Sequence, residues 1–311
     1  MITPARGAGT YSRFEDTMTA PDVRPVVVGV DGSSSALHAA RWAATEAARR
    51  KAPLSITHAC MLIPVQLPPG VELPRPYADA LTEQGREILA AALEAAREAA
   101  PEVEVTTELR GGAAAEHLIG RSASAELIVL GSRGLGGFTG LLVGSIAVAV
   151  ATHGHCPVIV VRGTDRPQDA PVVVGVDGSP TSEAALAFAF DAAAARGTRL
   201  VAVRAWSDFA VGNAWEFGSA LDWAAVQAAE ARLVEQQLDA YRSKYPDVPA
   251  QGVVVRDRPA HTLLERSEDA QLVIVGSRGR GGFRGLLLGS TSQALIHHSA
   301  SPVAVVPPAR Q

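Results

Sequence analysis

Unbroken hydrophobic runs alternate along the chain with longer segments in which apolar residues recur at helical spacing. Residues 26–30, for example, form a β-branched run with no polar break, as expected of a strand that is covered on both faces. Residues 35–50 carry the helical pattern. In the first half, the pattern predicts strands at residues 26–30, 54–60, 103–109, 127–130 and 157–161, and helices at residues 35–50, 77–100, 113–122 and 144–152. Residues 64–76 are too rich in proline for either element.

The whole pattern restarts after residue 170. Residues 171–179 repeat residues 25–33 at an offset of 146. A repeat of this size indicates a duplicated domain, and 311 residues suffice for two domains of about 150 residues. We therefore expect a flexible tail at 1–24, a first domain at 25–163, a linker at 164–170 and a second domain at 171–308. Met18 is an alternative start, because the repeated pattern begins at Pro25.

The regular alternation of strands and helices predicts an α/β fold, with doubly wound parallel sheets and helices on both faces. In such sheets, ligands bind beyond the carboxyl ends of the strands. The last strand of each half, residues 157–161 and 302–306, is apolar. Because bare apolar edges invite pairing, we expect the two domains to dock through these strands.

Composition limits the class of partner. The net charge of −4 does not indicate a nucleic-acid or membrane surface. Hydrophobic runs stay shorter than the ~18 residues of a membrane span, and residues 1–24 lack an apolar signal core. Two cysteines make no disulfide framework. These observations predict a cytoplasmic protein without nucleic-acid or membrane partners.

One glycine loop occurs twice, each time between a predicted strand and a predicted helix. Each copy reads Gly-Ser-Arg-Gly, nine further residues and Gly-Ser, beginning at Gly131 and at Gly276. Glycines allow close backbone approach, and the N–H groups of a helix start attract anions. A tight turn without ligand is the alternative, but two copies with identical spacing favour a phosphate site. The only lysines are Lys51 and Lys244, neither of which follows glycine, so a Walker A loop is excluded.

This spacing resembles the ATP-binding signature of the universal stress protein family, and the resemblance covers about residues 25–307. It implies the strand order 3-2-1-4-5 in each domain and one ATP per domain, with Mg²⁺ or Mn²⁺ bound through the phosphates. It also implies a stress-response regulator or sensor with an unknown regulatory protein partner, and it allows a homodimer of the whole chain.

The resemblance carries the role of nucleotide contact to positions in both domains. In the first domain they are Gly29, Val30, Asp31, Ala59, Gly112, Leu130, Gly131, Arg133, Gly134, Gly144, Ser145 and Ile146. In the second they are Gly175, Val176, Asp177, Ala205, Val275, Gly276, Arg278, Gly279, Gly289, Ser290, Thr291 and Ser292. The two aspartates would recognise adenine or ribose; capping of the following helix by the aspartate or the adjacent serines is the alternative.

Each domain departs from the family pattern after its third strand. The family's Gly-x-Pro-Ala turn lacks its proline in the first domain, where it begins at Gly112, and its glycine in the second, where it begins at Asp257. A carboxylate at position 257 would weaken phosphate binding unless it points away or pairs with Arg256 or Arg258.

Neither a metal site nor a catalytic centre is predicted. His153, His155 and Cys156 have metal-ligand character, but no fourth ligand is evident and the second half does not repeat them. No nucleophile lies next to a base, and an arginine cannot act as one. A nucleotide-binding regulator is therefore expected. A slow ATPase or nucleotide-dependent phosphotransferase, and a scaffold whose glycine loops are structural turns, are the alternatives.

Overall fold

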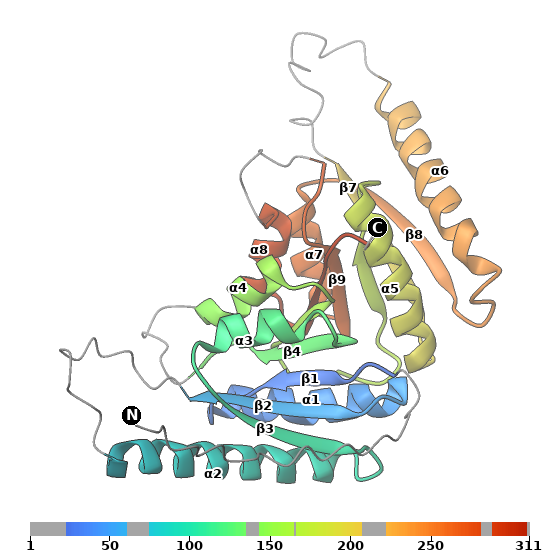
Figure 1. The fold of residues 1–311 in the computed structure, drawn as a ribbon. Coiled ribbons are helices and arrows are strands. Elements are labelled where there is room, and N and C mark those ends of the chain that lie inside the picture. Colours follow the sequence, from blue (N-terminus) through green and yellow to red (C-terminus); the bar gives the residue numbers. More distant parts are fainter. Residues whose placement is uncertain are drawn as a thin grey trace, which may run out of the picture.

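The computed structural model of the protein describes residues 23–60, 75–134, 143–164, 166–206, 222–280 and 288–309 (Figure 1). The first half contains β1 (Val26–Gly29), α1 (Ser34–Arg50), β2 (Leu54–Cys60), α2 (Arg75–Ala99), β3 (Val105–Gly111), α3 (Ala114–Arg121), β4 (Leu127–Gly131), α4 (Ser145–His153) and β5 (Val158–Val161). The second half contains β6 (Val172–Gly175), α5 (Pro180–Arg196), β7 (Leu200–Trp206), α6 (Trp223–Arg242), β8 (Ala250–Arg256), α7 (Pro259–Ser267), β9 (Leu272–Gly276), α8 (Ser290–His298) and β10 (Val303–Val306). The Pro-rich segment of the first half lies mostly outside the described residues.

The strands form one sheet in the order β3-β2-β1-β4-β5-β10-β9-β6-β7-β8. Within each half the strands pair in parallel and follow the predicted order 3-2-1-4-5, so the predicted fold class is confirmed. The halves join where β5 and β10 pair antiparallel, with Val160 opposite Val303. This pairing confirms the predicted docking of the two domains.

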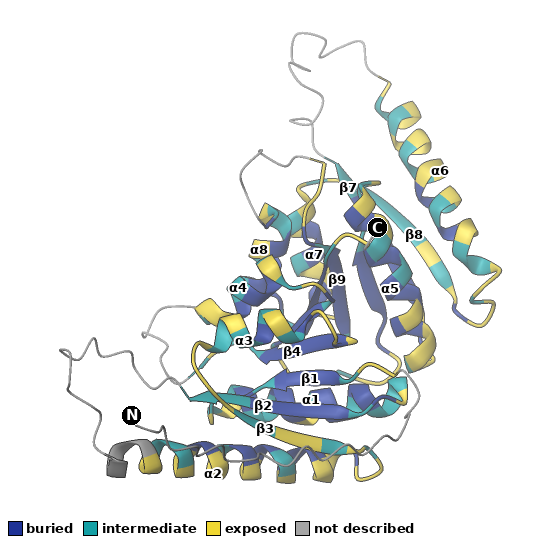
Figure 2. Ribbon diagram, viewed as in Figure 1, coloured by how far each residue is buried: buried dark blue, intermediate teal, exposed yellow. Residues whose placement is uncertain are grey.

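Alternate residues of the central strands face two different hydrophobic cores. Val26 and Val28 belong to a cluster that includes residues of α1, α2, α5 and α6 on one face, and Val27 belongs to a cluster that includes residues of α3, α4, α7 and α8 on the other. Because both faces are covered, β1, β4, β6 and β9 are buried almost throughout, whereas the edge strands β3 and β8 are largely half-buried or exposed (Figure 2).

One strand is displaced from the sequence-based expectation. The third strand spans Val105–Gly111 instead of residues 103–109, since β3 is an edge strand whose limits are set by pairing with β2 and not by an apolar run. Cys60 and Cys156, both within the described ranges, are free cysteines.

Candidate functional site

The carboxyl ends of β1 and β4 bring the strand-one aspartate against the glycine loop. The two strands are neighbours, with Gly29 opposite Leu130. A Cβ atom added to Gly134 would lie 2.4 Å from Oδ2 of Asp31, too close to be accommodated without movement. The two residues are about a hundred positions apart in the sequence, and they become neighbours because β1 and β4 are adjacent strands.

The second domain builds the same contact. A Cβ atom on Gly279 would lie 2.6 Å from Oδ2 of Asp177. The same carboxylate oxygen accepts a hydrogen bond of 2.8 Å from the backbone N–H of Arg280. The aspartate therefore also fastens the beginning of the second glycine loop.

Serines, and not the aspartates, cap the helices that follow β1 and β6. Ser33 accepts from the N–H of Ala36, and Ser179 accepts from the N–H of Ser182. Oδ1 of Asp31 instead accepts from the N–H of Ser33 at 3.0 Å, and Oδ1 of Asp177 does the same for Ser179 at 2.9 Å. Of the two capping arrangements considered from sequence, the one through the adjacent serines is present. The aspartates orient the loop and turn their second oxygen toward the glycines.

The helices that follow the glycine loops begin without a side-chain cap among the described residues. Gly144 and Gly289 occupy the N-cap positions of α4 and α8. Their own N–H groups donate to the carbonyls of Ser132 (3.0 Å) and Ser277 (2.8 Å), which close each loop onto its helix. The next N–H groups of the first turn have no partner within the helix, so this end favours negative charge.

Backbone conformation does not require glycine at these two positions, and an added Cβ would meet nothing closer than 3.5 Å. Gly144 has φ −69° and ψ 141°, and Gly289 has φ −68° and ψ 150°, values open to any residue. A side chain at either position would enter the gap between helix start and loop, where Gly134 N lies 4.0 Å from a Cβ on Gly144. Positive φ, expected for the loop from its glycines, is absent at the described loop positions.

Gly131 and Gly276 serve the packing of the fold. A Cβ atom on Gly131 would lie 2.8 Å from backbone atoms of Ser35, and one on Gly276 would lie 2.8 Å from the backbone of Thr181. The first turns of α1 and α5 thus press directly on the ends of β4 and β9. These contacts hold the aspartate loop and the glycine loop at a common edge.

The remaining sequence-predicted residues surround this edge in different ways. Val30, Leu130, Val176 and Val275 are buried, whereas Ser145, Ile146 and Ser290 are exposed at the helix starts. Ala59 and Ala205 are half-buried at the ends of β2 and β7. Ser292 is buried, and its hydroxyl donates to the carbonyl of Gly276 at 2.8 Å. Ser292 therefore ties α8 to β9.

Histidines that sequence reasoning did not select lie beside the first site. His58 Nδ1 lies 2.7 Å from the carbonyl of Val30, and His117 Nε2 lies 2.9 Å from the hydroxyl of Thr57. Burial lowers the pKa of His117, although Glu108 opposes the shift. His58 lies near the carboxyl end of β2, where ligands bind in such sheets, whereas His117 lies within α3 and has no comparable signal in the sequence.

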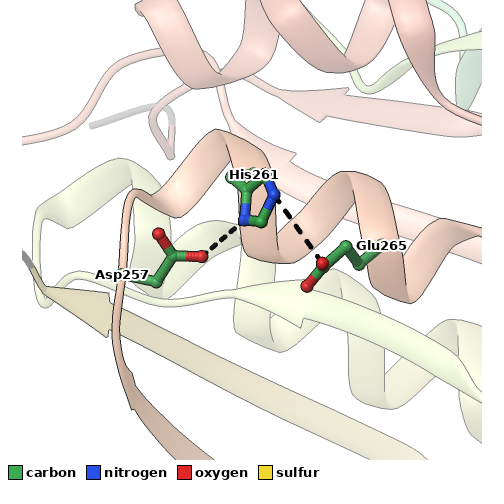
Figure 3. Close-up of side chains that lie close together, drawn as sticks. All are labelled: Asp257, His261 and Glu265. Carbon is green, nitrogen blue, oxygen red and sulfur yellow. Dashed lines mark hydrogen bonds and ion pairs between the residues drawn. The ribbon is translucent and has the colours of Figure 1, made fainter.

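Asp257 does not stand unpaired at the second site. Its carboxylate accepts from the N–H of Arg258 at 2.6 Å and lies 2.6 Å from Nδ1 of His261 (Figure 3). The hydrogen bond from His261 holds the pKa of Asp257 below its usual range. The sequence analysis considered pairing with the Arg256 or Arg258 side chains; His261 is the partner found in the structure.

A cavity of about 220 Å³ lies between the domains next to the second glycine loop. It is lined by Ala151, Thr152, Gly154, His155, Ser277, Arg278, Pro307 and Pro308. At the equivalent place in the other domain, Arg162 donates to the carbonyls of Ile296 (2.6 Å) and Ser299 (3.2 Å) at the end of α8. Pro307 stands 145 residues after Arg162, the same offset as the glycine loops, and has no such side chain. Arginine thus fills one position and proline leaves the other hollow.

The fold and the site define a tandem, doubly wound α/β protein in which a glycine loop follows the fourth strand of each half. The sequence model of the universal stress protein family matches residues 22–162 and again residues 170–307. The chain therefore belongs to the universal stress protein family and carries two of its domains in tandem.

Curated relatives and a solved structure agree with this assignment. Universal stress protein Rv2005c of Mycobacterium tuberculosis is 42% identical over 287 residues, which cover 90% of this chain and 96% of that protein. Universal stress protein Rv2623 of the same organism is 40% identical over 292 residues, covering 90% and 95%. A universal stress protein from Archaeoglobus fulgidus superimposes with a TM-score of 0.69 at 20% identity, covering 92% of this chain and 98% of that one, and so shares the fold.

None of the helices in the described ranges is long and apolar enough to cross a membrane.

Proposed function

We propose that the protein is a stress-response regulator or sensor that binds one adenine nucleotide, ATP, in each domain. The observation that carries this proposal is the repeated contact between the strand-one aspartate and the glycine loop, next to an uncapped helix start. A carboxylate can accept hydrogen bonds from ribose hydroxyls. The helix start and loop N–H groups suit phosphates, and any Mg²⁺ or Mn²⁺ would be held through those phosphates.

The site has carboxylates at one end and uncapped helix N–H groups at the other, and this arrangement favours a whole nucleotide over a bare anion. Asp31 and Asp177 would repel phosphate, so the phosphates belong at Gly144 and Gly289 and the nucleoside belongs at the aspartates. The space above both helix starts is kept open by the absence of a side chain. Binding and release of the nucleotide, and not its turnover, would be the signal passed to a protein partner in the cytoplasm.

The sharpest test is to fill this space. Gly144→Val and Gly289→Val introduce a side chain where phosphate would lie, while the backbone angles remain acceptable to valine. Loss of about two charge-assisted hydrogen bonds costs about 3 kcal/mol, or a hundredfold in affinity. Calorimetry should show two ATP sites in the unaltered chain, one in each single variant and none in the double variant.

Gly120→Val is the matched control, since an added Cβ at this exposed position meets nothing within 4 Å. Circular dichroism checks that every variant is folded. Undiminished ATP binding in the folded double variant would show that the loops are structural turns.

A further inference from the structure

Asp257, His261 and Glu265 form a cluster at the start of α7, and none of the three is among the predicted nucleotide contacts. Asp257 follows the end of β8, and the other two residues lie one and two turns farther along the helix (Figure 3). Residues four apart share a helix face. One ligand atom from each residue can be chosen so that all lie within 4.8 Å of one another, the only group of this kind found in the described residues.

The two distances in the cluster have different meanings. His261 Nδ1 lies 2.6 Å from Asp257 Oδ2, which is a hydrogen bond and too short for two ligands of one cation. His261 Nε2 lies 3.7 Å from Glu265 Oε1. Two atoms bound to one Zn²⁺ at about 2.1 Å and a near-tetrahedral angle are about 3.4 Å apart. The distance between His261 Nε2 and Glu265 Oε1 is therefore close to the distance between two ligand atoms of one Zn²⁺.

Asp257 is held in place as an orienting group would be. Besides contacting His261, its carboxylate accepts from the N–H of Arg258 at 2.6 Å and from the hydroxyl of Thr262 at 3.3 Å. In metal sites, the ligating histidine commonly donates its other ring N–H to such a carboxylate, which fixes the tautomer and leaves the second nitrogen for the metal.

The first domain has no counterpart of this cluster. At an offset of 145 residues, Gly112, Glu116 and Gly120 stand in place of Asp257, His261 and Glu265. Two of the three positions in the first domain are therefore glycines, which have no side chain to bind a cation or to orient a ligand. A site in the second domain would give the chain one cation and distinguish its two halves.

We propose that His261 and Glu265 bind one divalent transition cation of the Zn²⁺ class, with Asp257 as a positioning residue and water in the remaining coordination positions. One imidazole and one carboxylate suit Zn²⁺ better than Mg²⁺, which prefers oxygen ligands only. The side chains of Asp257, His261 and Glu265 are 36%, 52% and 66% exposed, so the cation reaches them directly from solvent.

A proton competes with the cation for His261. The hydrogen bond from Asp257 raises the pKa of His261, Glu265 adds to this shift, and Arg258 opposes it. Zn²⁺ needs the neutral ring, so binding releases a proton and weakens as the pH falls.

The test is calorimetric titration of Zn²⁺ into the nucleotide-free, tag-free full chain, with Mg²⁺ for comparison. We expect one Zn²⁺ per chain, tighter binding at about pH 7.5 than at about pH 5.5, and no comparable Mg²⁺ binding. His261→Ala should abolish binding, and Glu265→Gln should weaken it at least tenfold. Asp257→Ala should weaken it about ten- to a hundredfold, and Asp257→Asn less, because its amide oxygen still accepts from Nδ1–H.

His298→Ala is the matched control, since this exposed histidine lies at the end of α8. Its Zn²⁺ binding should equal that of the unaltered chain. Absence of binding up to millimolar Zn²⁺, or equal binding by folded His261→Ala, overturns the proposal. Because no nucleotide is present, either result leaves the proposed ATP sites untouched.

Discussion

The two domains have the same strand order, but their sequences differ at the interface between them. α1 and α5 lie at the junction, and positions 42, 46 and 50 of α1 correspond to 188, 192 and 196 of α5. Arg50 lies over the ring of Phe188 at 4.8 Å, and Arg196 lies over the ring of Trp42 at 5.9 Å, so the two helices exchange equivalent contacts. Glu46 has no equivalent, because position 192 is alanine.

One carboxylate consequently serves both domains. Glu46 is fully buried; its Oε1 lies 2.6 Å from Arg50 Nε, and its Oε2 lies 2.6 Å from Arg196 Nη2. Duplication thus preserved the exchanged arginines, while the single buried carboxylate of Glu46 pairs with both; Arg50 also pairs with Glu126 at 3.3 Å. The comparison teaches that the halves are not interchangeable: two copies of the second domain would bring two arginines together without a carboxylate.

Removal of Glu46 should have the largest effect on stability. Glu46→Ala leaves Arg50 and Arg196 without their shared partner in a buried interface, which costs about 3–5 kcal/mol of unfolding free energy. Chemical denaturation measures the loss. Glu98→Ala is the control, because its pair with Arg41 is exposed and should contribute less than about 1 kcal/mol. A Glu46→Ala loss no larger than the Glu98→Ala loss would contradict the shared-carboxylate account.

The pH dependence of this ion pair has a defined sign. Burial alone would raise the pKa of Glu46, but Arg196 and Arg50 outweigh it and lower the pKa below its ordinary value. A lowered folded-state pKa contributes stability above the unfolded-state value and loses it as the pH falls through the folded-state value. The difference in stability between the unaltered chain and Glu46→Ala should therefore shrink on acidification below the ordinary carboxyl range.

The aspartates offer the next comparison, between the two proposed nucleotide sites. Asp31→Ala and Asp177→Ala should each weaken ATP at their own site by about 1.5–3 kcal/mol, roughly ten- to a hundredfold, if the carboxylate accepts from the nucleoside. Inorganic tripolyphosphate should be affected much less. To measure one site at a time by calorimetry, Asp31→Ala is combined with Gly289→Val, and Asp177→Ala is combined with Gly144→Val.

The smallest expected difference concerns Arg162 and Pro307. Arg162→Ala removes two hydrogen bonds to the last carbonyls of α8 and should cost about 1–2 kcal/mol. Pro307→Ala alters only the lining of the cavity and should cost less than about 1 kcal/mol. Thermal unfolding compares the pair. Equal losses would mean that the arginine side chain does not stabilise the junction.

Local sequence was sufficient for most of the fold. β2 has the limits expected from its apolar run, and α1 begins within one residue of its predicted start, because the hydrophobic period and the serine cap are both local signals. β3 is displaced by two residues from its predicted position, because its residues are half-buried or exposed and no buried apolar run marks its ends. The spacing Asp257-x₃-His261-x₃-Glu265 is present in the sequence, but spacing alone does not show which of these side chains contact one another.

What the sequence by itself determined was the duplication, the alternation of strands and helices, and the residues available at each strand end. These properties follow from periodicity and composition within short windows. Only the tertiary structure decided that Asp31 lies against Gly134, that Gly144 has backbone angles open to any residue, and that Glu46 pairs with two arginines. Such contacts join residues far apart in the chain. They depend on strand order and helix packing, which bring distant side chains to one place and which no short window of sequence contains.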